Sequence, residues 1–134
     1  MKKLIAIIEK GDSEGYDIFA SGDEPLFACG LTEQEARQTF LDLIPEQAEY
    51  IKERTGQYPE WYSEDLEVEF RYDMSAFFQC FPFINATELA KEIGINPSLM
   101  RRYRSGLAKA SEKQKNLIQM KFDEIIDRLS TVRF

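Results

Sequence analysis

NATELAKEIGINPSLMRRYRSG, residues 85–106, predicts two short helices separated by a glycine-centred turn. Asn85 is a suitable N-cap for the first helix, whose apolar stripe comprises Leu89, Ala90 and Ile93. Gly94 supplies the left-handed residue that ends this helix. Asn96 and Pro97 begin the next helix at once, as N-cap and first helical residue. This spacing is typical of a helix-turn-helix.

The second of these helices has two faces of different chemistry. At about 100° per residue, Met100 and Tyr103 lie within about 60° of each other, and we expect both to be buried. The opposite face carries Ser98, Arg101, Arg102 and Ser105. Recognition helices present such side chains to base edges and phosphates. The sequence therefore predicts binding to double-stranded operator DNA, with contacts from Asn96, Ser98, Leu99, Arg101, Arg102, Ser105, Lys109 and Lys113. The alternative is an ordinary helix pair with a solvated basic face.

A further capping box at residues 111–114 predicts a C-terminal helix. Its wide apolar stripe comprises Leu117, Ile118, Phe122, Ile125, Ile126 and Leu129. Part of this stripe must cover the helix-turn-helix. The remainder is a candidate dimer seam, which a two-fold operator requires, so we expect a homodimer or a higher homo-oligomer.

The N-terminal half predicts four strands and a helix in the order β-β-β-α-β. The strands are expected at residues 3–9, 16–21, 25–29 and 66–72, with a turn at residues 11–15. A capping box at residues 32–35 begins the helix, and Pro45 is expected to end it or to begin a second one. The fold class is therefore α+β, with a small β-β-β-α-β domain at residues 1–72 and an all-α domain at residues 73–134.

Two segments of this half are candidates for protein contact. The last strand alternates strictly, so Glu67, Glu69 and Arg71 are expected to point outward. The loop at residues 56–63 is rich in aromatic residues, and we interpret it as a lid over the core rather than a partner contact.

Charge divides the chain into two halves of opposite sign. Residues 1–82 hold 7 Lys and Arg against 18 Asp and Glu, a net charge of −11. Residues 83–134 hold 10 against 6, a net charge of +4. An acidic half joined to a basic one indicates two partners of opposite charge. The alternative for the acidic half is a surface that only favours solubility.

Several classes of function have no support in the residues. The chain has no histidine, the commonest general base and metal ligand, and we expect neither an enzyme, a metal nor a cofactor. Cys29 and Cys80 are interpreted as two small buried hydrophobic residues. The apolar run after Lys3 is too short for a signal peptide, and no segment approaches a membrane span, so a cytoplasmic protein is expected.

The residues from Asp73 to about Leu129 resemble the helix-turn-helix branch of the HicB-type antitoxin family. The likeness comprises the Phe77-Phe78 pair, Asn85 with Leu89-Ala90, the run from Gly94 to Leu99, Tyr103, Gly106 and residues 111–114. In the N-terminal half it consists of residues 30–32, Glu35-Ala36 and the strand order. This chain departs from the family at residues 29–32, which replace its usual Gly-x-Gly-x-Thr loop, and at residues 56–63, which resemble an insertion.

The resemblance implies a bifunctional antitoxin of a type II toxin-antitoxin system. Its N-terminal domain would cover a small basic HicA-like ribonuclease toxin, with Glu67 and Glu69 as candidate contacts. Its C-terminal domain would bind the operator as a transcriptional autorepressor. The alternatives are a stand-alone regulator whose N-terminal domain oligomerises or senses another partner, and an interaction module that has lost DNA binding.

Overall fold

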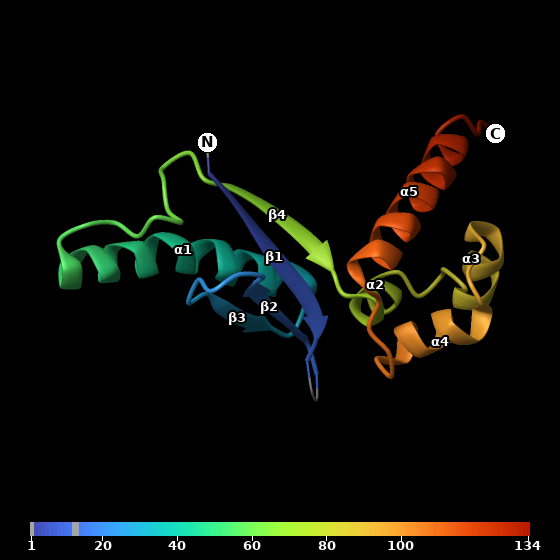
Figure 1. The fold of residues 1–134 in the computed structure, drawn as a ribbon, viewed down its shortest axis with the longest axis horizontal. Coiled ribbons are helices and arrows are strands. Elements are labelled where there is room, and N and C mark those ends of the chain that lie inside the picture. The colour runs from blue at the N-terminus through green and yellow to red at the C-terminus, as the bar shows by residue number, and fades with distance from the viewer. Residues whose placement is uncertain (1, 12–13) are drawn as a thin grey trace. The chain divides into compact units, whose positions relative to one another are not determined.

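The computed structural model describes residues 2–11 and 14–134 and has an α+β fold, shown in Figure 1. The described residues form a four-stranded mixed sheet and five helices. In chain order the elements are β1 (Lys3–Lys10), β2 (Tyr16–Ala20), β3 (Phe27–Gly30), α1 (Glu33–Thr55), β4 (Glu67–Tyr72), α2 (Met74–Cys80), α3 (Ala86–Ile93), α4 (Pro97–Ser105) and α5 (Glu112–Leu129).

The chain forms two compact units, Met1–Cys80 and Phe81–Phe134. The sequence placed a boundary after Tyr72, whereas here the first unit also includes α2. The reason is packing, because Ala76 is fully buried in the core that the strands share with α1. The ring of Phe77 also packs edge-on against that of Tyr72, with 6.4 Å between their centroids.

The sheet has the strand order β3-β2-β1-β4. Strands β1, β2 and β3 pair antiparallel, and β4 pairs parallel to β1 at the opposite edge. A parallel pair needs a long crossover, and α1 with the loop after it supplies this connection. Of the turn predicted at residues 11–15, Asp12 and Ser13 lie outside the described residues.

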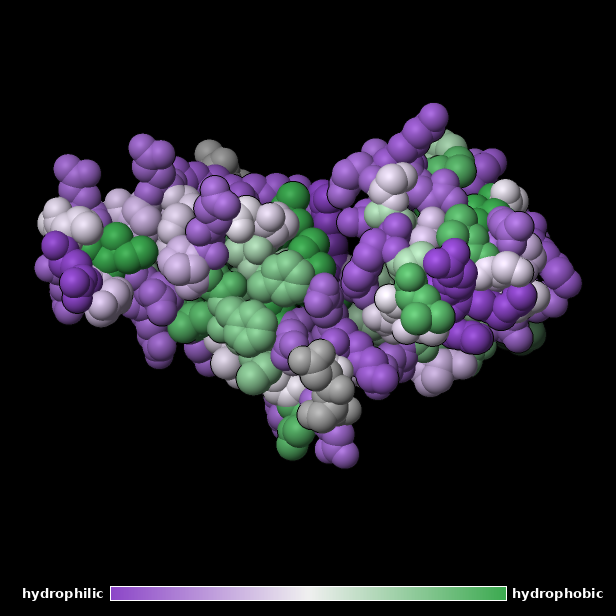
Figure 2. Space-filling model, turned by 60° about the horizontal axis from the view of Figure 1, so that its bottom comes forward, coloured by the Kyte–Doolittle hydropathy of each residue, from purple (hydrophilic) through white to green (hydrophobic). Residues whose placement is uncertain are grey.

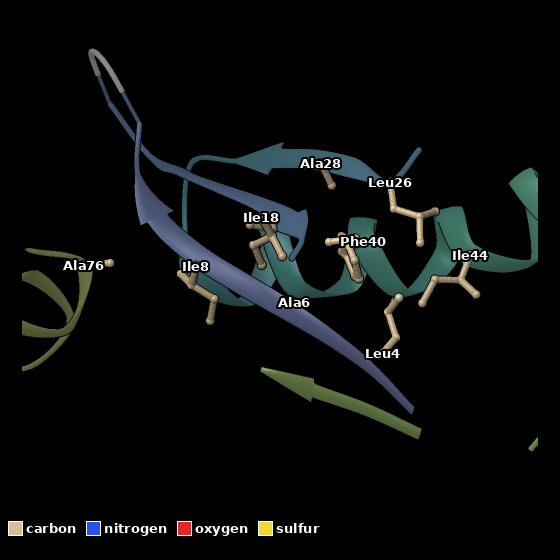
Figure 3. Packing of buried hydrophobic residues seen from close by; sticks show 11 residues of the cluster. Leu4, Ala6, Ile8, Ile18, Leu26, Ala28, Phe40, Ile44 and Ala76 are labelled. Atoms are coloured by element: carbon tan, nitrogen blue, oxygen red, sulfur yellow. The ribbon is translucent and has the colours of Figure 1, made fainter. Parts of the chain in front are cut away.

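One face of the sheet packs against α1. Figure 3 shows the side chains between them, with Leu4, Ala6 and Ile8 of β1 opposite Phe40 and Ile44 of α1. The alternating residues of β4 join the same core as the sequence predicts, and they comprise Val68, Phe70 and Tyr72. Trp61 and Tyr62 of the aromatic loop also pack against this core, which fits the interpretation of residues 56–63 as a lid.

The expected break at Pro45 is wrong, because α1 runs continuously from Glu33 to Thr55 through the proline. Its buried side chains recur every four residues on both sides of the proline, as Ala36, Phe40, Ile44 and Ala48. The Pro45 ring lies on the exposed side of the helix. Packing of one unbroken apolar stripe therefore outweighs the loss of a single backbone hydrogen bond.

The second unit contains α3, α4 and α5. Its buried side chains are Ala86, Ala90, Ile93, Ile95, Met100, Tyr103 and Ile118. Helix α5 adds only Ile118 to this set, and the rest of its apolar stripe is partly or largely exposed. Across the residues that the structure describes, no helix combines the length and the apolar character needed to cross a membrane.

Candidate nucleic-acid interface

Local hydrogen bonds define the ends of α3 and α4. The Asn85 side chain accepts from the backbone N–H of Glu88 at 3.0 Å, and the Asn96 side chain accepts from that of Ser98 at 2.8 Å. Gly94 ends α3 with a φ of +82°, in the left-handed region where a Cβ introduces strain. Because α4 begins three residues later, the turn holds the two helices at a fixed angle.

The inner face of α4 is completely buried. Met100 has no exposed surface, and Tyr103 retains 5% of its surface. Both were expected inside from the helical spacing alone. Ile95, which follows the turn glycine, is also buried and donates its N–H to the carbonyl of Ala90 at 2.9 Å. These contacts fix the rotation of α4 about its axis, and hence the residues on its outer face.

Arg101 lies on that outer face and is held by two hydroxyl groups. Its guanidinium donates to Thr87 Oγ1 of α3 at 3.0 Å and to Ser98 Oγ at 3.1 Å. Thr87 was not among the predicted residues, because its contact with Arg101 spans 14 positions and depends on how α3 packs against α4. The arginine is therefore oriented by both helices while its side chain remains exposed.

The other predicted residues of α4 differ in what they present. Arg102 is exposed, and no hydrogen bond or ion pair joins its guanidinium to a described residue. Ser105 is exposed, but its hydroxyl donates to the backbone carbonyls of Arg101 and Arg102 at 3.1 and 3.3 Å. The side-chain oxygen of Asn96 accepts hydrogen bonds from the first N–H groups of α4, and Leu99 is half-buried. Arg101 and Arg102 are thus the principal charged groups on this face.

Lys109 and Lys113 lie beyond α4, in the connection to α5 and in the first turn of α5. Both side chains are exposed. A lysine ammonium is a compact charge without the planar fork of arginine, so these positions suit phosphate contacts rather than base recognition.

Helix α5 leaves several large apolar side chains exposed: Leu117, Met120, Ile126 and Leu129. A cavity of about 320 Å³ lies beside its C-terminal half, lined by Glu92, Ile125, Arg128, Leu129 and Val132. An ion pair between Arg128 and Glu92 of α3 lies at this cavity. Of these residues, Leu117, Ile125, Ile126 and Leu129 belong to the apolar stripe whose uncovered part the sequence offered as a dimer seam.

The predicted acidic contacts lie in the other unit. Glu67 is exposed on β4 and faces Lys3 of β1 in the sheet register. Glu69 forms ion pairs with Lys3 at 2.9 Å and with Arg71 at 2.5 Å. Hydrogen bonds from Lys3 and Arg71 lower the pKa of the Glu69 carboxyl. Part of the negative charge on this strand is thus already matched within the sheet.

A polar cluster in the first unit was not predicted. Glu33 Oε1 accepts hydrogen bonds from Arg37 at 2.9 Å and from the hydroxyl of Tyr72. The Cys80 thiol also donates a hydrogen bond to Glu33, and the Tyr16 hydroxyl donates one to Cys80. Burial, followed by the hydrogen bond to Glu33, raises the pKa of the Cys80 thiol to about 11. A thiol with such a pKa stays protonated at neutral pH and is a poor nucleophile.

The two cysteines differ from the expectation of small buried residues. Cys80 is half-buried, and Cys29 is exposed because its position on β3 points away from α1. Among the described residues, no group of three or more cysteine and acidic side chains is arranged to hold a metal ion.

Comparison with known proteins gives no relative for the chain. No protein-family model matches it, and neither a curated protein nor a solved structure matches it.

Proposed function

We propose that the protein is a two-partner regulator of the HicB antitoxin type. In this proposal α3 and α4 form a helix-turn-helix that binds operator DNA, and α4 is the recognition helix. The acidic first unit binds and sequesters a small basic ribonuclease toxin. The complete chain then acts as an autorepressor of its own promoter and works as a homodimer or a higher oligomer.

One observation carries the DNA half of the proposal. The outer face of α4 presents two adjacent exposed arginines, Arg101 and Arg102, while Met100 and Tyr103 anchor its inner face. Arginine forms bidentate hydrogen bonds with guanine in the major groove, and its charge also suits phosphates. The bonds from Arg101 to Thr87 and Ser98 support a base-reading role, because a preoriented side chain loses less entropy on binding.

The partner half is supported by charge. Residues 1–82 carry a net charge of −11, whereas DNA needs a basic surface. The first unit is therefore unsuited to nucleic acid and suited to a cationic protein. The two units would then bind partners of opposite charge without competing for one surface.

Substitution of Arg101 and Arg102 by Ala tests the DNA half. We expect operator affinity to fall by roughly 1–3 kcal/mol for each lost base contact, with discrimination against unrelated DNA lost. Gel shifts on the chain's own promoter and on a scrambled duplex measure both effects at one fixed salt concentration.

Arg104→Ala is the matched control. Arg104 is an exposed arginine of the same helix, but it lies on the side of Met100 rather than on the face of Arg101 and Arg102. This variant should bind the operator and the scrambled duplex with equally reduced affinity, and the preference for the operator should be unchanged. Unchanged operator shifts for the double variant, or an equal loss of preference in Arg104→Ala, would show that this face does not read the operator.

A further inference from the structure

The sheet of the first unit has a second face that α1 does not cover. Strand β1 is apolar on both sides, with Leu4, Ala6 and Ile8 buried under α1 and Ile5 and Ile7 on the other side. Strands with two apolar faces normally lie in sheets that are covered on both. Figure 2 shows green, hydrophobic side chains gathered in the middle of the first unit, surrounded by purple hydrophilic residues.

The apolar residues on this face form a row across three strands. Ile7 of β1 is opposite Phe19 of β2, which is opposite Phe27 of β3. Ile5 lies two residues along β1 on the same face. Phe27 is 59% exposed although it is in a strand, and Cys29 beside it is also exposed. A continuous row of this kind is typical of a binding surface.

Charged residues, with more acidic than basic side chains, border this apolar row on both sides. On one side Glu9 is opposite Asp17 across the β1–β2 pair. On the other side Glu69 is opposite Ile5, Arg71 is opposite Ile7, and Glu67 is opposite Lys3, across the β1–β4 pair. An apolar centre within a charged border is the common arrangement of a protein interface. Here four of the bordering side chains are carboxylates, and the two cations among them, Lys3 and Arg71, both pair with Glu69.

We propose that this uncovered sheet face, formed around Ile5, Ile7, Phe19 and Phe27, is where a basic protein with an apolar patch docks. The inference deepens the partner half of the proposed function and rests on it for the kind of partner. The apolar row supplies the buried contact area, and the acidic border steers and selects a cationic surface.

Charge favours such a partner over a second copy of the chain. A symmetric contact through this face would bring together two units that each carry a net charge of −11. Like charges facing each other at an interface oppose association. A cationic partner instead matches Glu67 and Asp17. Neither carboxylate forms an ion pair with a described residue, whereas Glu69 pairs with Lys3.

Photo-crosslinking in the full chain tests the surface. Phe27 is replaced by p-benzoylphenylalanine, the chain is expressed in its source cells, and the crosslinked protein is identified and purified. The matched control carries the same group at Leu41, a 38% exposed residue on α1. We expect position 27 alone to capture a protein with an isoelectric point above about 9.

The purified protein is then titrated against the unmodified chain, Phe27→Asp and Leu41→Asp at two salt concentrations. The proposal predicts that Phe27→Asp raises Kd at least about tenfold, that Leu41→Asp changes it less than about twofold, and that salt weakens the complex. Capture of a second copy at position 27, capture of no basic protein there, or equal Kd values for the two variants would overturn it.

The outcome also separates this inference from the proposed function. A basic protein captured only at position 41 would leave the two-partner proposal standing and overturn the sheet face. A chain that fails to shift its operator would overturn the DNA half, whatever position 27 captures.

Discussion

Glu33 is a half-buried carboxylate that accepts hydrogen bonds from Arg37 and Tyr72. Partial burial raises its pKa, but hydrogen bonds from Tyr72, Cys80 and Arg37 outweigh this and hold the pKa below its usual value of 4.5. The Arg37 guanidinium also lies over the ring of Phe70, 4.6 Å from its centroid. One carboxylate thus joins α1 to β4 and α2.

Replacing Glu33 by Gln should therefore destabilise the first unit in a pH-dependent way. Because the folded pKa is depressed, the ionised carboxylate stabilises the fold above about pH 4.5, and this contribution disappears as the pH falls through the folded pKa. We expect a loss of roughly 1–2 kcal/mol at pH 7 and a smaller loss at pH 3.5, measured by urea unfolding.

Glu46→Gln is the control, since Glu46 is an exposed residue of the same helix. It should change stability little at either pH. If the loss in Glu33→Gln were equal at pH 7 and pH 3.5, the hydrogen bonds to Glu33 would not depend on its charge.

Side chains whose role depends on local periodicity were predictable from the sequence. Helical spacing alone placed Met100 and Tyr103 inside, and both are buried. The contact between Arg101 and Thr87 was not predictable, because it needs the angle between two helices. The hydroxyl of Ser105 turned back to its own helix, since a serine near a helix end competes for backbone carbonyls.

At the scale of elements, α1 shows where local rules fail. The cap at Thr32 was predicted, and its hydroxyl accepts from the N–H of Glu35 at 3.1 Å. Pro45 was expected to interrupt the helix and does not. The prediction considered only the hydrogen bond that proline cannot donate. In the structure, the burial of Phe40 and Ile44 before the proline and of Ala48 after it also stabilises the helix. Tertiary packing decides the outcome.

Pro45→Ala should consequently stabilise the protein. Alanine restores the backbone N–H and removes the clash of the ring with the preceding turn, and the Pro45 side chain is exposed rather than part of the core. The gain is offset in part because alanine makes the unfolded chain more flexible, so we expect a net increase of roughly 1–2 kcal/mol in the free energy of unfolding.

Urea unfolding measures this gain, with Pro25→Ala as the control because Pro25 is exposed and lies outside the helices. The control should gain nothing. A loss of stability in Pro45→Ala would mean that the proline supports α1 at this position, for instance as the first residue of a separate helical segment.

For the whole molecule, charge and element order were predictable from the sequence. The boundary between the two units was not, since it follows Cys80 and not Tyr72. The acidic and basic halves follow directly from composition. The parallel pairing of β4 with β1 could not be derived from strand patterns, because it joins residues that are more than 60 positions apart in the chain. Helix α2 has the composition of a helical segment and was assigned with the later helices, although its burial places it with the sheet.

Fragments of the first unit test this division. A fragment ending at Cys80 keeps Ala76 in the core and Cys80 beside Glu33, whereas one ending at Tyr72 loses both. We expect residues 1–80 to unfold cooperatively in urea and residues 1–72 to be less stable by roughly 2–3 kcal/mol, because apolar surface of β1 and β4 becomes exposed.

A fragment ending at Ile84 is the matched control for length, since the added residues belong to the second unit. It should unfold at the same urea concentration as residues 1–80. If residues 1–72 were as stable as residues 1–80, α2 would not be part of the first unit. Partner-binding assays on the isolated acidic unit should therefore use residues 1–80, because a shorter fragment could fail through loss of folding rather than loss of the contact surface.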